Sequence, residues 1–176
     1  MKEIRPHDER QAPRLLLLAG KLGYQTNTFL EAAKRAGAEV TIGSDRCHQL
    51  EDPWSDGAIA MHFEEPEDAA KTALAHLGDK KLDGVLALGD RPTETAAYVA
   101  KSLGIPYNTP ESVRNCRSKF RQRELMRAAN LPVPEFFSFT FSEPIDQVQK
   151  RVEFPCVVKP CTSGRPKFPV LSIVLP

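Results

Sequence analysis

The sequence predicts an α/β fold in which helices cover both sides of a parallel sheet. Short apolar runs, each of strand length, alternate along the chain with segments that have helical periodicity. Glycine follows most of these segments, and the connections between them are short. Alternation of this kind is typical of a parallel sheet, because parallel strands must be joined by crossover connections that are usually helices.

The first predicted strand covers residues 14–19, a continuous apolar run that ends at Gly20. Leucine would also suit a helix, but the short length and the glycine favour a strand buried on both faces. A helix from Thr26 or Asn27 to about Ala36, with Phe29 on its apolar face, and a strand over 38–42 complete a unit of βαβ size. The pattern recurs as a short strand at 58–63, a helix at 67–77, a strand at 82–88, and a helix from Pro92 to about Gly104.

The character of the chain changes after residue 107. Ser118 is predicted to cap a helix over 119–129, and Asn130 is a plausible left-handed stop before two prolines. A short helix from Thr109-Pro110, a strand over 135–141, a helix over 144–151 and a strand over 154–160 are also predicted. We therefore expect four segments: a flexible tail (1–13), a Rossmann-like domain (14–108), a second region (109–160) and a divergent C-terminal tail (161–176).

The composition is that of a soluble globular protein, with 41% hydrophobic and 27% charged residues. A formal net charge of +1 argues against binding of the whole chain to nucleic acid or to an acidic membrane. The polar N-terminus has no apolar core of a signal peptide, and the longest early apolar run is too short to span a bilayer. The four cysteines are sparse and lack metal-ligand spacing, so we expect reduced thiols, a cytoplasmic location and no zinc bound by cysteine and histidine.

Two glycine-containing turns could bind a ligand in the first domain. The turn Gly20-Lys21-Leu22-Gly23 could cradle a phosphate with its backbone N–H groups, but it lacks both common phosphate-loop spacings. We therefore favour a turn that needs glycine for close packing. Asp90 follows a predicted strand, where ligands bind in open α/β sheets. It could contact a polar ligand, but a helix cap ahead of Pro92 is the favoured interpretation.

A basic stretch and a single lysine stand out in the second region. Six cations lie between residues 114 and 127, and Lys119, Arg123 and Arg127 share a helical face. A solvated surface explains most of them better than nucleic-acid binding, which needs aromatic partners; Phe120 is predicted to pack inward. Lys159 ends an apolar strand, where its ammonium group either meets an anion or reaches out to solvent.

Residues 118–134 (SKFRQRELMRAANLPVP) and 154–160 (FPCVVKP) together resemble the opening of an ATP-grasp domain. In that family a lysine begins a helix, a small-residue turn ends it, and an apolar-Pro-x-Pro segment leads into a strand. The second lysine of the family ends a strand similar to 154–160, and its spacing from the first also matches. The domain before it resembles the pre-ATP-grasp domain of enzymes such as carbamoyl-phosphate synthase and biotin carboxylase.

The resemblance implies an ATP-dependent ligase that joins a small carboxylate to an amine or thiol through an acyl phosphate, with magnesium on the nucleotide phosphates. By analogy, Lys119 and Lys159 would contact the ATP phosphates, and Ser163-Gly164 would be the remnant of a phosphate loop. A homodimer is compatible with this family. The resemblance implies no nucleic-acid or membrane partner.

The likeness ends after Pro160. Pro166 and Pro169 remove backbone donors that a phosphate loop would use. The family's adenine-binding hinge, acidic magnesium ligands and carboxylate-binding arginine would lie further on, so we expect a truncated form that is inactive alone. No partner strand is expected for the apolar residues after 169. The alternative is a non-enzymatic module that binds a small molecule or a partner at the strand ends.

Overall fold

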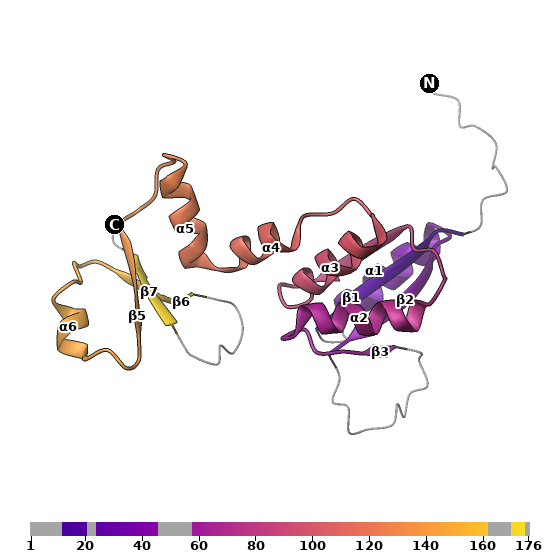
Figure 1. The fold of residues 1–176 in the computed structure, drawn as a ribbon, viewed down its shortest axis with the longest axis horizontal. Helices are drawn as coiled ribbons and strands as arrows, with labels where there is room; N and C mark the ends of the chain where they lie inside the picture. Colours follow the sequence, from indigo (N-terminus) through magenta and orange to yellow (C-terminus); the bar gives the residue numbers. More distant parts are fainter. Residues whose placement is uncertain (1–11, 21–23, 46–57, 162–169, 175–176) are drawn as a thin grey trace. The chain divides into compact units, whose positions relative to one another are not determined.

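The computed structural model describes residues 12–20, 24–45, 58–161 and 170–174. The chain divides into two compact units, residues 1–109 and residues 110–176, which are described separately. Figure 1 shows the helices and strands of both units in sequence colours.

The first unit contains a four-stranded parallel sheet with the order β3-β2-β1-β4. Its strands are β1 (Arg14–Ala19), β2 (Glu39–Ser44), β3 (Ile59–Ala60) and β4 (Gly84–Leu88), and its helices are α1 (Tyr24–Arg35), α2 (Pro66–Leu77) and α3 (Thr93–Leu103). The chain moves outward from β1 to β3 and then returns to place β4 on the other side of β1. The crossover from β1 to β2 and the crossover from β3 to β4 run in opposite directions across the sheet. Because such crossovers are right-handed, helices α1 and α2 lie on opposite faces of the sheet. The predicted α/β class is therefore confirmed.

The core of this unit lies between the sheet and helices α2 and α3 (Figure 1). Leu16 and Leu18 on the central strand are fully buried, and they pack with small residues of the two helices such as Ala73 and Ala96. The alanines allow the helices to approach the sheet closely. Leu17, with 2% of its surface exposed, points to the opposite face because side chains alternate along a strand.

Three local predictions in this unit are wrong. Helix α1 begins at Tyr24, ahead of both predicted caps, and Phe29 on its supposed apolar face is 43% exposed. Helix α3 begins at Thr93 after Pro92, and within the described chain no side chain caps it. Asp90 contributes its backbone carbonyl instead, which accepts a hydrogen bond of 2.6 Å from the Thr93 hydroxyl.

The second unit combines three helices with a three-stranded antiparallel sheet of order β5-β7-β6. Its elements are α4 (Pro110–Arg117), α5 (Lys119–Ala128), β5 (Phe136–Thr140), α6 (Ile145–Gln149), β6 (Val157–Pro160) and β7 (Val170–Val174). The predicted boundaries of α5 are confirmed closely. The Ser118 side chain accepts the Arg121 N–H, and Asn130 has a positive φ of 56° after the helix.

Strand β7 overturns the expectation that the residues after 169 have no partner strand. It lies between β5 and β6 and pairs with both, so that Ser172 is opposite Ser138 on one side and Lys159 on the other. This apolar segment, which would favour aggregation if it were unpaired, is therefore the central strand of the sheet.

Candidate functional site

The structure joins the two segments that carry Lys119 and Lys159. The backbone N–H of Lys119, at the first residue of α5, donates a hydrogen bond of 2.8 Å to the carbonyl oxygen of Cys161. Cys161 follows the end of β6 directly and is 7% exposed. Lys159 lies two residues before it, so the backbones that carry the two predicted lysines meet at one place in the second unit.

The beginning of α5 is held by several hydrogen bonds. Ser118 caps the helix by accepting the Arg121 N–H at 3.2 Å, and the Arg123 side chain donates to the carbonyl of Lys119 at 3.1 Å. A helix N-terminus carries a partial positive charge, which adds to the charge of Lys119. The half-buried Lys119 therefore belongs to a hydrogen-bonded first turn whose electrostatics favour an anion.

The strand that carries Lys159 near its end is present, but it is not buried as the sequence predicted. The apolar run before it indicated a buried strand, but β6 is exposed along its whole length, with Val157 and Val158 each 51% exposed. Among the described strands, β6 is at the edge of the sheet and pairs with β7 alone, and neither face of its side chains is covered. The desolvation argument for an anion at Lys159 therefore fails, and its role depends on its position next to the start of α5.

The described residues offer no site for magnesium. Within residues 12–20, 24–45, 58–161 and 170–174, no group of three or more His, Cys, Asp or Glu side chains could hold a metal ion. Ser163 and Gly164, the predicted remnant of a phosphate loop, lie outside the described residues.

A second polar cluster, missed by the sequence analysis, lies in the first unit at the carboxyl ends of the strands. The Arg91 guanidinium, after β4, forms ion pairs with Asp45, after β2, and with Glu64, after β3. His62 lies 3.9 Å from the Asp45 carboxylate. Partial burial raises the pKa of Glu64, but the hydrogen bond and the charge of Arg91 outweigh it and lower the pKa overall. The one sequence signal for this cluster is that Arg91 follows Asp90 at the carboxyl end of a predicted strand.

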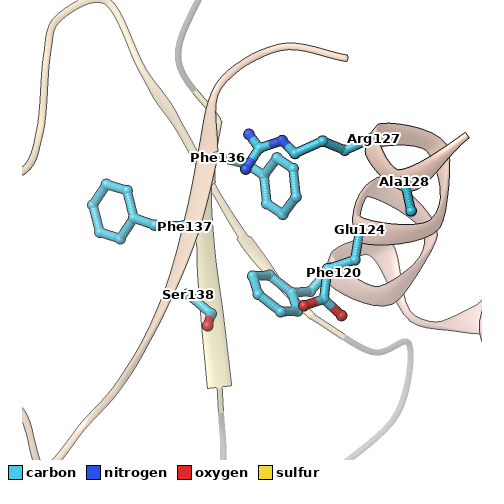
Figure 2. A pocket seen from close by; sticks show the side chains of 7 residues that line it. All are labelled: Phe120, Glu124, Arg127, Ala128, Phe136, Phe137 and Ser138. Carbon is cyan, nitrogen blue, oxygen red and sulfur yellow. The ribbon is translucent and has the colours of Figure 1, made fainter. Parts of the chain in front are cut away.

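Helix α5 and strand β5 enclose an open cavity of about 540 Å³ (Figure 2). Arg127, one of the six cations of the basic stretch, is half exposed and places its guanidinium 4.4 Å from the centre of the Phe136 ring. Phe120 packs edge-to-face against the same ring with 5.4 Å between centroids, which confirms its predicted inward position. Contacts between a helix and a strand that follows it cannot be read from local periodicity, so the sequence did not reveal this cavity.

Comparison with known proteins identifies related sequences and folds. Residues 30–107 match the family model of the ATP-grasp N-terminal domain. The ATP-grasp enzyme fsqD of Aspergillus fumigatus is 27% identical over 143 residues, which cover 76% of this chain and 24% of the fungal protein. The match with fsqD extends well beyond the 78 residues from 30 to 107.

Two solved structures with a similar fold are roughly twice the length of this chain. The L-amino acid ligase of Bacillus licheniformis has a TM-score of 0.70 and 18% identity, with 93% of this chain and 44% of that chain covered. Carboxyaminoimidazole ribonucleotide synthase of Aspergillus clavatus, solved with ATP, has a TM-score of 0.64 and 19% identity, with 94% and 47% covered. This chain thus spans less than half of each. Among its described helices, none is long and apolar enough to cross a membrane.

Proposed function

We propose, from the match of residues 30–107 to the ATP-grasp N-terminal domain, that the chain supplies the first nucleotide-binding lysines of an ATP-dependent ligase. Lys119 and Lys159 would contact the phosphates of ATP in the second unit. The reaction would join a small carboxylate to an amine or a thiol. The chain spans less than half of the two solved structures named above, so the activity of the whole protein is likewise a proposal.

The observation that carries the proposal is the hydrogen bond between the Lys119 N–H and the Cys161 carbonyl. It links the beginning of α5 to the residue after β6, and so places two lysine-bearing backbones side by side. Phosphoryl transfer depends on positioned cations more than on covalent groups of the protein. A helix N-terminus that begins with one lysine, next to a strand that carries a second lysine, is a suitable arrangement for a polyphosphate.

The contribution of each group follows from its local structure. The backbone of Lys119 is fixed by the capped first turn of α5, so only its side chain would have to be ordered when a phosphate binds. Lys159 extends from an exposed edge strand, and a point charge on a flexible stem can follow a phosphate as it moves. When bound, ATP would supply the phosphoryl group that activates the carboxylate for attack by the nucleophile.

Magnesium does not fit the described residues, because they include no cluster of oxygen ligands for it. Nucleotide binding by this chain should depend on its two lysines and on the positive end of α5.

Calorimetric titration of the purified chain with ATP, with and without magnesium, tests the proposal. The Lys119→Ala and Lys159→Ala variants should each weaken binding roughly tenfold to a hundredfold, since a charge-assisted hydrogen bond is worth about 1.5–3 kcal/mol. Lys101→Ala in α3 and Lys150→Ala after α6 remove exposed lysines elsewhere and should leave binding unchanged. Equal binding by the parent chain and the Lys119→Ala, Lys159→Ala double variant would refute the phosphate role.

A second function is favoured by the Arg91 cluster. Three strand ends contribute to it, and the carboxyl edge of an open parallel sheet is where such folds bind small molecules. As a non-enzymatic module, the first unit would bind a polar molecule there without ATP. Ligand binding that is lost in Arg91→Met but retained in the Lys119→Ala, Lys159→Ala double variant would favour this function. Ligand binding that is retained in Arg91→Met but lost in the double lysine variant would favour the ligase.

A further inference from the structure

The cavity between α5 and β5 has an apolar centre and charged groups on one wall. Phe136 of β5 is 8% exposed and forms the base, while Phe120 meets it edge-on from α5. Figure 2 shows the Arg127 guanidinium beside the Phe136 ring, with the Glu124 carboxylate and the Phe120 ring extending from the same helix. A volume of about 540 Å³ lies within the range of small-molecule sites.

Both charges of this wall are held by partners that a ligand could replace. Arg127 pairs with Glu135 at 3.1 Å, and Glu124 pairs with Arg121 at 3.2 Å. All four side chains are at least two-fifths exposed, and exposed ion pairs contribute little to stability. The described contacts of Arg127 use one guanidinium nitrogen and one ring face, whereas a guanidinium has five N–H donors.

We propose that this cavity binds a zwitterionic amino acid with an apolar side chain. The ligand carboxylate pairs with Arg127, whose fork of donors matches two carboxylate oxygens. The ammonium group pairs with Glu124, which lies three residues earlier and therefore on the same helical face. The apolar side chain packs against Phe120 and Ala128. This site is separate from Lys119 and Lys159, and the proposal does not depend on ATP binding.

The combination of groups selects this ligand class over simpler ones. A ligand with only a negative charge would place that charge near the Glu124 carboxylate. A ligand with only a positive charge would place it near the Arg127 guanidinium. A purely apolar ligand would cover both ion pairs without replacing them, which is unfavourable for charged groups. Only a molecule with both charges and an apolar part satisfies the whole lining.

A ligand series without ATP tests the proposal on the full chain. L-phenylalanine should shift the NMR signals of the Phe120 and Phe136 rings, with a dissociation constant on the order of 1 mM for a ligand of this size. 3-Phenylpropionate lacks the ammonium group, phenethylamine lacks the carboxylate, and L-alanine lacks the large side chain. Each should bind at least about fivefold more weakly than L-phenylalanine.

Variants separate binding in the cavity from general surface binding. Arg127→Gln and Glu124→Gln should each weaken binding of L-phenylalanine about fivefold or more, and Ala128→Trp should abolish it by filling the cavity from the exposed helix surface. Lys150→Gln and Asp146→Asn make the same charge changes beside α6 and should have no effect. Thermal unfolding of each variant establishes that it is folded.

Two results would overturn the proposal. One is a parent chain that binds L-phenylalanine no more tightly than 3-phenylpropionate or phenethylamine. The other is a folded Ala128→Trp variant that binds L-phenylalanine as the parent does. A chain that binds ATP but no amino acid would refute this site and leave the proposed ligase function intact.

Discussion

The backbone N–H of Lys119 donates to the carbonyl oxygen of Cys161 at 2.8 Å, across 42 positions of sequence from the first residue of a helix to the end of a strand. An N–H in the first turn of a helix has no partner within the helix. Its use in a contact with β6 means that the cap of α5 and the position of Lys159 depend on one another. A change that loosens the first turn should therefore affect the site as well as the helix.

Ser118→Ala tests this dependence. The substitution removes the oxygen that accepts the Arg121 N–H, and loss of such a cap destabilises a helix by about 1 kcal/mol. We expect faster amide exchange in the first turn of α5 and weaker ATP binding, although no phosphate ligand has been removed. Ser102→Ala in α3, an exposed serine near a helix end, is the control. An unchanged affinity for ATP in Ser118→Ala would show that ATP binding does not depend on the cap of α5.

Gly43→Ala should destabilise the first unit because its side chain has no room. A Cβ at this position of β2 would lie 2.6 Å from the Leu18 Cδ2 and 2.7 Å from the Met61 Cε. Both neighbours are buried, and overpacking of a core costs about 1–3 kcal/mol.

Urea unfolding measures this effect against a matched substitution. At Gly20, after β1, an added Cβ meets no described atom within 4 Å, so Gly20→Ala should change the free energy of unfolding by less than about 0.5 kcal/mol. Equal unfolding midpoints for the two variants would mean that Leu18 and Met61 move aside freely.

The elements that the sequence predicted well are those with a local cause. A continuous leucine run bounded by glycine predicted β1. Ser118 caps the beginning of α5 and Asn130 adopts a left-handed conformation after its end, as the sequence predicted. Strand β7 was missed because its pairing with β5 and β6 is decided by tertiary structure, with no local signal in an isolated apolar run. For the same reason the apolar composition of β6 wrongly predicted burial.

The candidate site divides in the same way. Lys119 and Lys159 could be identified from the sequence because their spacing resembles that of the ATP-grasp family. The hydrogen bond from the Lys119 N–H to the Cys161 carbonyl, which brings the two segments together, could be seen only in the structure. The ion pairs of Arg91 join three strand ends that are far apart in sequence. The stacking of Arg127 on Phe136 depends on how α5 meets β5. Such contacts depend on the relative placement of elements, and a single sequence does not encode that placement locally.

Asn130 should tolerate glycine but not valine. Its φ of 56° is left-handed, and the Leu131 N–H donates back to the Met126 carbonyl at 2.9 Å to close the helix. Glycine adopts this conformation without strain, whereas a β-branched residue there is unfavourable by about 1–2 kcal/mol. Thermal unfolding should place Asn130→Gly at or above the parent and Asn130→Val below it. A Val variant as stable as the Gly variant would show that the turn is not held in this conformation.

The ion pairs of Arg91 should make the stability of the first unit depend on pH in the acid range. Despite the opposing effect of partial burial, Arg91 lowers the pKa of Glu64 below its ordinary value, so the folded state favours the ionised carboxylate. The resulting stability is fully present above the ordinary pKa and is lost as the pH falls through the lowered one. Because Glu64 is more than half exposed, the effect is small and should shrink further in high salt.

Urea unfolding at a series of pH values, for the parent and for Arg91→Met, measures this contribution. In the variant the pKa of Glu64 returns toward its ordinary value, so the difference in stability between the two proteins should be largest at neutral pH and should narrow as the solution is acidified. Lys71→Met is the matched control, because Lys71 forms only an exposed pair with Asp68 one turn away on α2. A gap between parent and Arg91→Met that stayed constant from neutral to acid pH would show that Arg91 acts through packing and not through its charge.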